Sequence, residues 1–313
     1  MKRYAAVVIS LLAVVILVTG VFGSMREGQT MQVRFNKRDL PKHEVQIITS
    51  ADPSFEAMVA SYFKTQSKTA KDLEPFSVFI KNSGNRTVVA YMLLWQLVRA
   101  DGRVLTNRTA YSEPAMLMGE ETPTDPRFKH TQAIEPNTVK CFSWSAPIAE
   151  GEAGIGSTQD LKAMLRQGSD ERNAAIRSQL TTELTQATDL TVSLDGVFFD
   201  DGSFVGPNTT GFFERMQAIV QAKLDLLRDI AAAATEGKED EVFDVITAKS
   251  LEPDSIITST ASPEDYYKYY TKLFATELSG MKSFYGKQKL VPHLKKLHER
   301  PRPVLKMEVW EER

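Results

Sequence analysis

Residues 190–230 read LTVSLDGVFFDDGSFVGPNTTGFFERMQAIVQAKLDLLRDI, and this stretch decides the fold. Apolar and polar residues alternate at 190–194, which is the two-residue period of a half-buried strand. Asp201 followed by Gly202 predicts a tight hairpin turn, because glycine readily adopts the positive φ that such turns need. Beyond Pro207, apolar residues recur every three or four positions as far as Gly237. That spacing predicts a long amphipathic helix packed on the strands.

Most of the predicted strands lie upstream of this junction, and most of the predicted helices lie downstream. Alternating or apolar runs at 76–81, 87–98, 104–109 and 139–144 add four strands to the pair at 190–205. The run at 87–98 is apolar on both faces, which places it at the centre of the fold. The fold class that we predict is α+β: an antiparallel immunoglobulin-like β-sandwich with a helical insertion and a C-terminal helical region.

The composition and the order of the predicted strands and helices suggest the domain boundaries. The 313 residues, 42% of them hydrophobic, are enough for one large core or two modest ones. We expect a leader at 1–24, an extended segment with a short helix at 25–72, and the sandwich at 73–207. The sandwich would carry the helical insertion at 157–186, and the helical region would occupy 208–313. Ser262 before Pro263 predicts a helix start, and alternation at 305–309 indicates a closing strand.

The N-terminal segment has the pattern of an export signal. Lys2 and Arg3 precede an apolar run at 5–18 in which Ser10 is the one polar residue. Because the apolar stretch extends to Phe22, it is also near the minimum length for a transmembrane helix. The segment is therefore either a cleaved signal or a retained membrane anchor. In both cases the bulk of the chain is predicted to be extracytoplasmic, secreted or held at the membrane by this segment.

The sequence contains no motif that identifies a catalytic, metal or cofactor site. Cys141, the single cysteine, lies in an apolar run and is interpreted as a buried small hydrophobe rather than as a nucleophile. His293 and His298 miss the spacing of a zinc pair. Asp195, Asp200 and Asp201 could gather around a hard cation, but the turn already explains the Asp-Gly pair. We therefore predict no catalytic residue, no metal and no cofactor, and the formal net charge of -2 argues against nucleic acid as a partner.

A candidate interaction surface lies in the C-terminal region. Two of four closely spaced tyrosines fall off the expected apolar stripe, and a basic stretch follows them. Exposed aromatic and basic side chains can bind another envelope protein or an anionic polymer, although packing and a solvated helix face are simpler explanations. The residues assigned to this surface are Tyr267, Tyr269, Lys289, Lys295 and Lys296.

At residues 76–98 and again at 190–202, the chain resembles the sandwich portion of uncharacterised exported bacterial proteins, and more loosely immunoglobulin-like domains. Trp95 on the central strand is similar to the buried tryptophan of those folds, whereas their paired cysteines are missing here. The resemblance implies no catalytic residue. We expect a non-catalytic extracytoplasmic binding or envelope interaction module. The alternative is a hydrolase of unfamiliar type with a carboxylate site between the sandwich and the helices.

Overall fold

A computed structural model describes residues 33–63, 77–118, 133–143, 148–149, 186–235, 239–253, 257–258 and 261–310. The chain divides into two units, Met1–Arg34 and Phe35–Arg313. The second unit contains two sheets and the C-terminal helices, so the predicted α+β class is confirmed.

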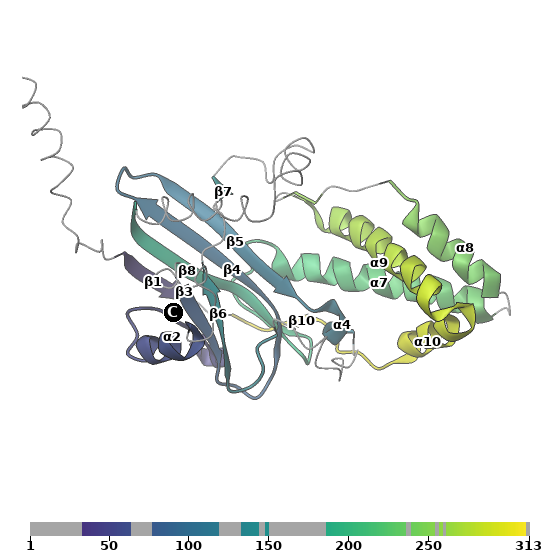
Figure 1. The fold of residues 1–313 in the computed structure, drawn as a ribbon, viewed down its shortest axis with the longest axis horizontal. Coiled ribbons are helices and arrows are strands. Elements are labelled where there is room, and N and C mark those ends of the chain that lie inside the picture. The colour runs from purple at the N-terminus through teal and green to yellow at the C-terminus, as the bar shows by residue number, and fades with distance from the viewer. Residues whose placement is uncertain are drawn as a thin grey trace, which may run out of the picture. The chain divides into compact units, whose positions relative to one another are not determined.

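The larger sheet is built around two long antiparallel strands, β4 (Val88–Arg99) and β8 (Ala187–Phe199) (Figure 1). As predicted, the region 87–98 is central and is buried on both faces at Tyr91 and Met92. Trp95 is 1% exposed, and its indole N–H donates to Thr109 Oγ1 at 3.0 Å. The other members are β1 (Arg34–Arg38), β5 (Val104–Ser112), β7 (Ile148–Ala149), β9 (Ser203–Val205) and β10 (Lys306–Met307). The strand order in the larger sheet is β10-β9-β8-β4-β5-β7, and β1 also pairs with β8.

The smaller sheet consists of β2 (Val45–Ile48), β3 (Ser77–Asn82) and β6 (Thr138–Ser143), all antiparallel. It contacts the larger sheet where the rings of Tyr91 and Phe142 meet at 5.2 Å. Helix α2 (Phe55–Phe63) packs on it through Phe55, whose ring centroid lies 5.7 Å from that of Phe79. A short 3-10 helix, η1 (Pro41–His43), connects β1 to β2.

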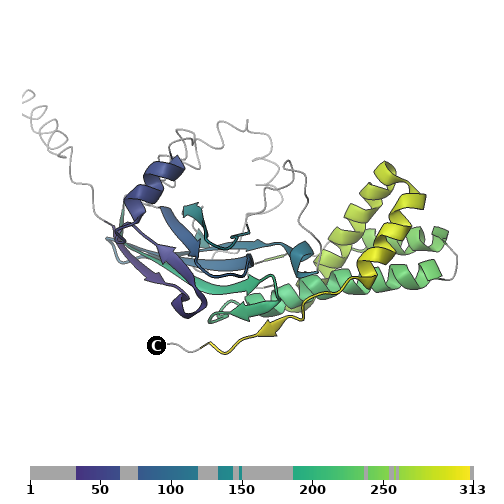
Figure 2. The same ribbon diagram turned by 90° about the horizontal axis from the view of Figure 1, so that it is seen from below.

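The long helix predicted after Pro207 is α7 (Phe212–Thr235), and it begins against the sheet. Phe213 stacks on Phe198 of β8 at 5.6 Å, because the apolar stripe of the helix and the buried face of the strand share one core. Figures 1 and 2 show α7 grouped with the other C-terminal helices. These are α8 (Glu239–Ser250), α9 (Pro263–Tyr285) and α10 (Lys287–Glu299), and a short helix α4 (Pro114–Leu117) follows β5. The start predicted at Ser262 is a capping box with Asp265.

The hairpin between β8 and β9 depends on two glycines. Gly202 has φ +81, in the region that non-glycine residues rarely adopt. A Cβ on Gly196 would lie 2.2 Å from the ring of Phe204, so only glycine lets this ring cross β8. The Asp-Gly turn and the strand pair predicted at 190–205 are therefore confirmed.

Two of the predictions fall partly or wholly on residues outside the described part. The helical insertion at 157–186 lies there except for its last residue, and so does the apolar segment 5–22. Across the described ranges, no helix is long and apolar enough to cross a bilayer. The longest, α7, carries charged residues such as Lys223, Asp225 and Arg228 along its length. The prediction of a transmembrane helix is thus wrong for the part of the chain that the structure describes.

Candidate binding groove

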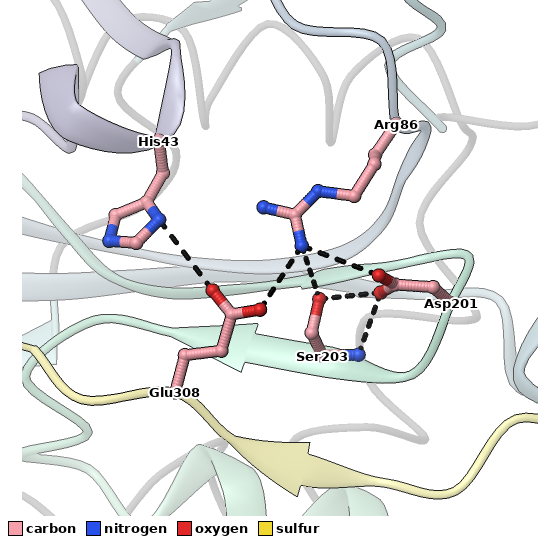
Figure 3. A network of polar contacts seen from close by, with 5 residues as sticks. All are labelled: His43, Arg86, Asp201, Ser203 and Glu308. Carbon is pink, nitrogen blue, oxygen red and sulfur yellow. Dashed lines mark hydrogen bonds and ion pairs between the residues drawn. The ribbon is translucent and has the colours of Figure 1, made fainter.

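The C-terminal tail returns from α10 to the sheet and is held there by a polar network around Arg86 (Figure 3). Arg86 follows β3, and its guanidinium donates to Ser203 Oγ at 2.7 Å and to Glu308 at 3.3 Å. It also donates to Asp201 at 3.4 Å and lies 3.8 Å above the ring of Phe199. One arginine therefore connects the hairpin between β8 and β9 to the last described residues of the chain.

Two ionisable groups in this network have shifted pKa values. Burial lowers the pKa of His43 below its ordinary 6.5; Glu308, 3.7 Å away, raises it, and the charges of Arg86 and Lys42 lower it further. Burial alone would raise the pKa of Asp201, but hydrogen bonds from Ser203 and the nearby Arg86 outweigh that effect and lower it. At neutral pH, then, the centre is an ionised Arg86 between two carboxylates with a neutral histidine beside them.

A groove of about 980 Å³ opens beside this network, on the side of His43. That volume is at the upper end of the range usual for small-molecule sites. Among the described residues, neither the guanidinium of Arg38 on its wall nor the hydroxyl of Ser193 on its floor has a hydrogen-bond partner. The wall consists of residues 38–43, the floor of Leu94, Ser193, Leu194 and Asp195, and the rim of Pro207, Thr209, Val309 and Trp310.

The carboxylate on the groove floor, Asp195, is 1% exposed and fully engaged in holding the start of α7. One oxygen accepts from the N–H of Thr209 at 2.8 Å and from its hydroxyl, and the other accepts from the N–H of Thr210 at 3.0 Å and from its hydroxyl. These four donors occupy the acceptor sites that a carboxylate offers. Arg215 donates to the Thr210 hydroxyl at 3.0 Å and so brings a positive charge near the buried anion.

The position of Asp195 follows from an irregularity in the sheet. The register between β4 and β8 shifts between Met92 and Leu93, which leaves Asp195 as an extra residue in β8. Such a bulge re-aims the side chain of the extra residue. The alternation of apolar and polar residues along β8 does not identify Asp195 as a buried residue at the junction between β8 and α7. No other signal in the sequence does so.

The remaining candidates for chemistry are separated from one another. Cys141 lies on β6 of the smaller sheet, and burial raises the pKa of its thiol to about 11. Asp201 binds Arg86 and Ser203, while Asp195 binds the loop before α7, so these carboxylates do not form a common site. Within the described ranges, no group of three or more His, Cys, Asp or Glu residues is placed to hold a metal ion.

The structure does not bring the five residues of the predicted interaction surface into one cluster. The Tyr267 hydroxyl donates to Asp225 of α7 at 3.1 Å, whereas the Lys295 ammonium donates to the carbonyl of Ala234 at 3.0 Å. Because Asp225 and Ala234 are separated on α7, these contacts lie roughly 13 Å apart along the helix axis. Tyr269 is 36% exposed and packs its ring against Tyr270, while Lys289 and Lys296 are exposed on α10.

Comparisons with protein-family models, with curated proteins and with solved structures find no match for this chain.

Proposed function

We propose that the chain is an exported, non-catalytic binding module, and that the groove holds an anionic segment of an envelope polymer. The observation that carries this proposal is that Arg38, whose guanidinium has no partner within the described residues, lines the same groove as the half-buried Trp310. Guanidinium groups pair with carboxylate and phosphate in a two-pronged geometry, and indole rings pack on apolar or sugar faces.

The charge balance of the groove also favours an anionic ligand. Arg38 and Lys42 line the wall with Asp39, and the second carboxylate, Asp195, is already bonded to four donors. Of these side chains, Arg38 supplies a positive charge that has no partner within the described residues. His43 adds no charge at neutral pH, because burial lowers its pKa.

The hydrolase alternative has less support. It needs a carboxylate that can exchange a proton or attack a substrate, but Asp195 uses its oxygens to fix the start of α7. Ser203 is 0% exposed and hydrogen-bonded to Asp201 and Arg86. The raised pKa of Cys141 disfavours the reactive thiolate form.

Two finer expectations belong to the same proposal. The contact between Tyr91 and Phe142 across the two sheets supports an immunoglobulin-like sandwich arrangement. The basic and apolar residues near the N-terminus support export. Cell fractionation with sequencing of the mature N-terminus tests the second point, and recovery of the chain in the cytoplasm would contradict it.

Titration of the full-length protein with polyglutamate and polyphosphate, using neutral dextran as the control polymer, tests the ligand class. We expect saturable quenching of the tryptophan fluorescence by a polyanion, with no such quenching in Trp310→Phe, and no shortening of the polymer. Arg38→Gln should weaken binding about tenfold or more, as expected for the loss of a charge-assisted pair. The matched control is Arg103→Gln, which removes an exposed arginine that does not line the groove. Equal binding by both variants, or tight binding of dextran, would overturn the proposal.

A further inference from the structure

The edge strand β10 has backbone hydrogen-bonding groups that no other described residue uses. The N–H groups of Lys306 and Glu308 donate to the carbonyls of Gly202 at 3.1 Å and Phe204 at 2.8 Å. Because backbone groups alternate in direction along a strand, those of Leu305, Met307 and Val309 point away from β9. Within the described ranges, the N–H groups of these three residues have no hydrogen-bond partner. Figure 2 shows β10 as the outermost strand on this side of the sheet.

The side chains along this edge are unusually apolar for a solvent-facing strand. Val304 is 78% exposed, Met307 49% and Val309 84%. Proteins normally protect an open edge with charges, prolines or a covering segment, because such an edge is a template for pairing with another strand. Lys306 is the one charge on this short strand that could act in this way, because the carboxylate of Glu308 is already paired with Arg86.

We propose that β10 pairs antiparallel with β10 of a second copy of this chain, in the register centred on Met307. In this register Lys306 of one copy lies opposite Glu308 of the other, and Leu305 lies opposite Val309. Lys306 of one copy therefore adds a positive charge beside the Glu308–Arg86 pair of the other on one face of the joined sheet, while the exposed Met307 and Val309 form an apolar stripe on the other. The outward backbone groups of residues 305, 307 and 309 form about six hydrogen bonds across the two-fold axis.

Other registers that keep the same backbone pairing are less favourable. The nearest ones, centred on Lys306 or Glu308, place two like charges opposite each other. A register centred on Leu305 would place Pro303 opposite Met307 at a position where an N–H is needed, and proline has none. A register centred on Val309 would place Met307 opposite Glu311 and Leu305 opposite Arg313, which sets apolar side chains against charges. The sequence of the tail thus favours one register, which is what specific pairing requires.

The proposed interface is short, so the dimer should form reversibly. It uses one strand per copy and falls below the area of about 1,200 Å² at which stable interfaces begin. We expect a monomer–dimer equilibrium that depends on concentration. This pairing does not depend on the identity of the groove ligand.

Cysteine cross-linking tests the register directly, with Cys141→Ser as the background so that one thiol remains. Paired residues in a hydrogen-bonded position have Cα atoms about 5.5 Å apart, within the range of about 4.4–6.8 Å that a disulfide spans. Met307→Cys should therefore form a disulfide-linked dimer under mild oxidation. The matched control is Val309→Cys, whose thiols would lie more than about 13 Å apart in this register although Val309 is the more exposed residue.

A second variant separates edge pairing from folding. Met307→Pro removes an outward N–H but leaves the two bonds from Lys306 and Glu308 to the neighbouring strand. In sedimentation velocity, the full-length protein should shift from monomer to dimer with concentration, and Met307→Pro should remain monomeric with an unchanged far-UV circular dichroism spectrum. The proposal fails if the wild-type protein stays monomeric at every concentration. It also fails if Val309→Cys cross-links as fast as Met307→Cys.

Discussion

Arg86 and Glu308 are 222 residues apart in the sequence, and the guanidinium of the first donates to the carboxylate of the second at 3.3 Å. This contact joins the loop after β3 to the C-terminal tail. The two side chains are 29% and 32% exposed, so the ion pair is shielded from water only in part. Arg86 has more partners than Glu308, since it also supports the buried Ser203 and covers the ring of Phe199.

Arg86→Ala should therefore cost more stability than the loss of the Glu308 charge. We expect a loss of about 2–3 kcal/mol for Arg86→Ala, because a buried hydroxyl and a ring lose their partner. Glu308→Gln should cost about 0.5–1 kcal/mol, as is usual for a partly exposed ion pair. Urea unfolding measures both, with Arg103→Ala as the exposed-arginine control. If Arg86→Ala and Arg103→Ala were equally stable, the network around Arg86 would not have the structural role described above.

His43 should make stability depend on pH just below neutrality. Its folded-state pKa is lowered from 6.5, so near pH 6 the unfolded chain binds more protons than the folded chain. The free energy of unfolding then falls as the pH decreases through 6.5 towards the folded pKa. In His43→Asn this part of the curve should be flatter, as measured by urea unfolding at a series of pH values. The lowered carboxyl pKa values of Asp52 and Asp201 act in a separate window below about 3.8. Identical curves for His43→Asn and the wild type between pH 7 and 5 would contradict this prediction.

Removing the carboxylate of Asp195 should destabilise the junction between β8 and α7. Asp195→Ala leaves two backbone N–H groups and two hydroxyls without their acceptor, and we expect a cost of about 3 kcal/mol. Asp200→Ala at the exposed hairpin should change stability by less than about 0.5 kcal/mol. Thermal unfolding followed by circular dichroism compares the two variants. A small effect for Asp195→Ala would leave the groove carboxylate available for chemistry and would revive the hydrolase alternative.

Two Gly→Ala substitutions should have opposite effects. At Gly196 the added Cβ would lie 2.2 Å from the ring of Phe204, so the ring must move and about 2–4 kcal/mol should be lost. Gly280 lies within α9 with nothing within 4 Å of the added Cβ. Gly280→Ala should stabilise the protein by about 0.5–1 kcal/mol through helix propensity. Denaturant unfolding of both variants gives the sign of each change in the free energy of unfolding. No change in that free energy for Gly196→Ala would contradict the close approach of Phe204 to β8.

Cys141 should react slowly in the folded protein. Burial raises the pKa of its thiol to about 11, so at pH 8 about one thiol in a thousand is ionised. Alkylation by iodoacetamide, followed by mass spectrometry, should be slow at pH 8 and should accelerate towards pH 11. In urea the same thiol should react much faster at pH 8. Equal rates in the folded and unfolded states would show that Cys141 is not protected.

Much of the local structure was predictable from the sequence because it depends on spacing within one segment. Alternation at 190–205 and the Asp-Gly turn predicted β8 and β9, and the three- and four-residue repeat predicted α7. Ser262 before Pro263 predicted the start of α9. In each case the apolar period or the cap contact lies within a few residues, so the signal does not depend on the rest of the chain.

The groove and its supporting network were decided by the tertiary structure alone. The sequence places Arg38, Ser193 and Trp310 in three distant segments, and they share one groove only because β1, β8 and the tail converge at one side of the sheet. The register shift that turns Asp195 towards Thr209 and Thr210 arises from pairing with β4. Strand order and register depend on interactions between distant segments, which no local period encodes, and this is why the elements could be read from the sequence whereas the site could not.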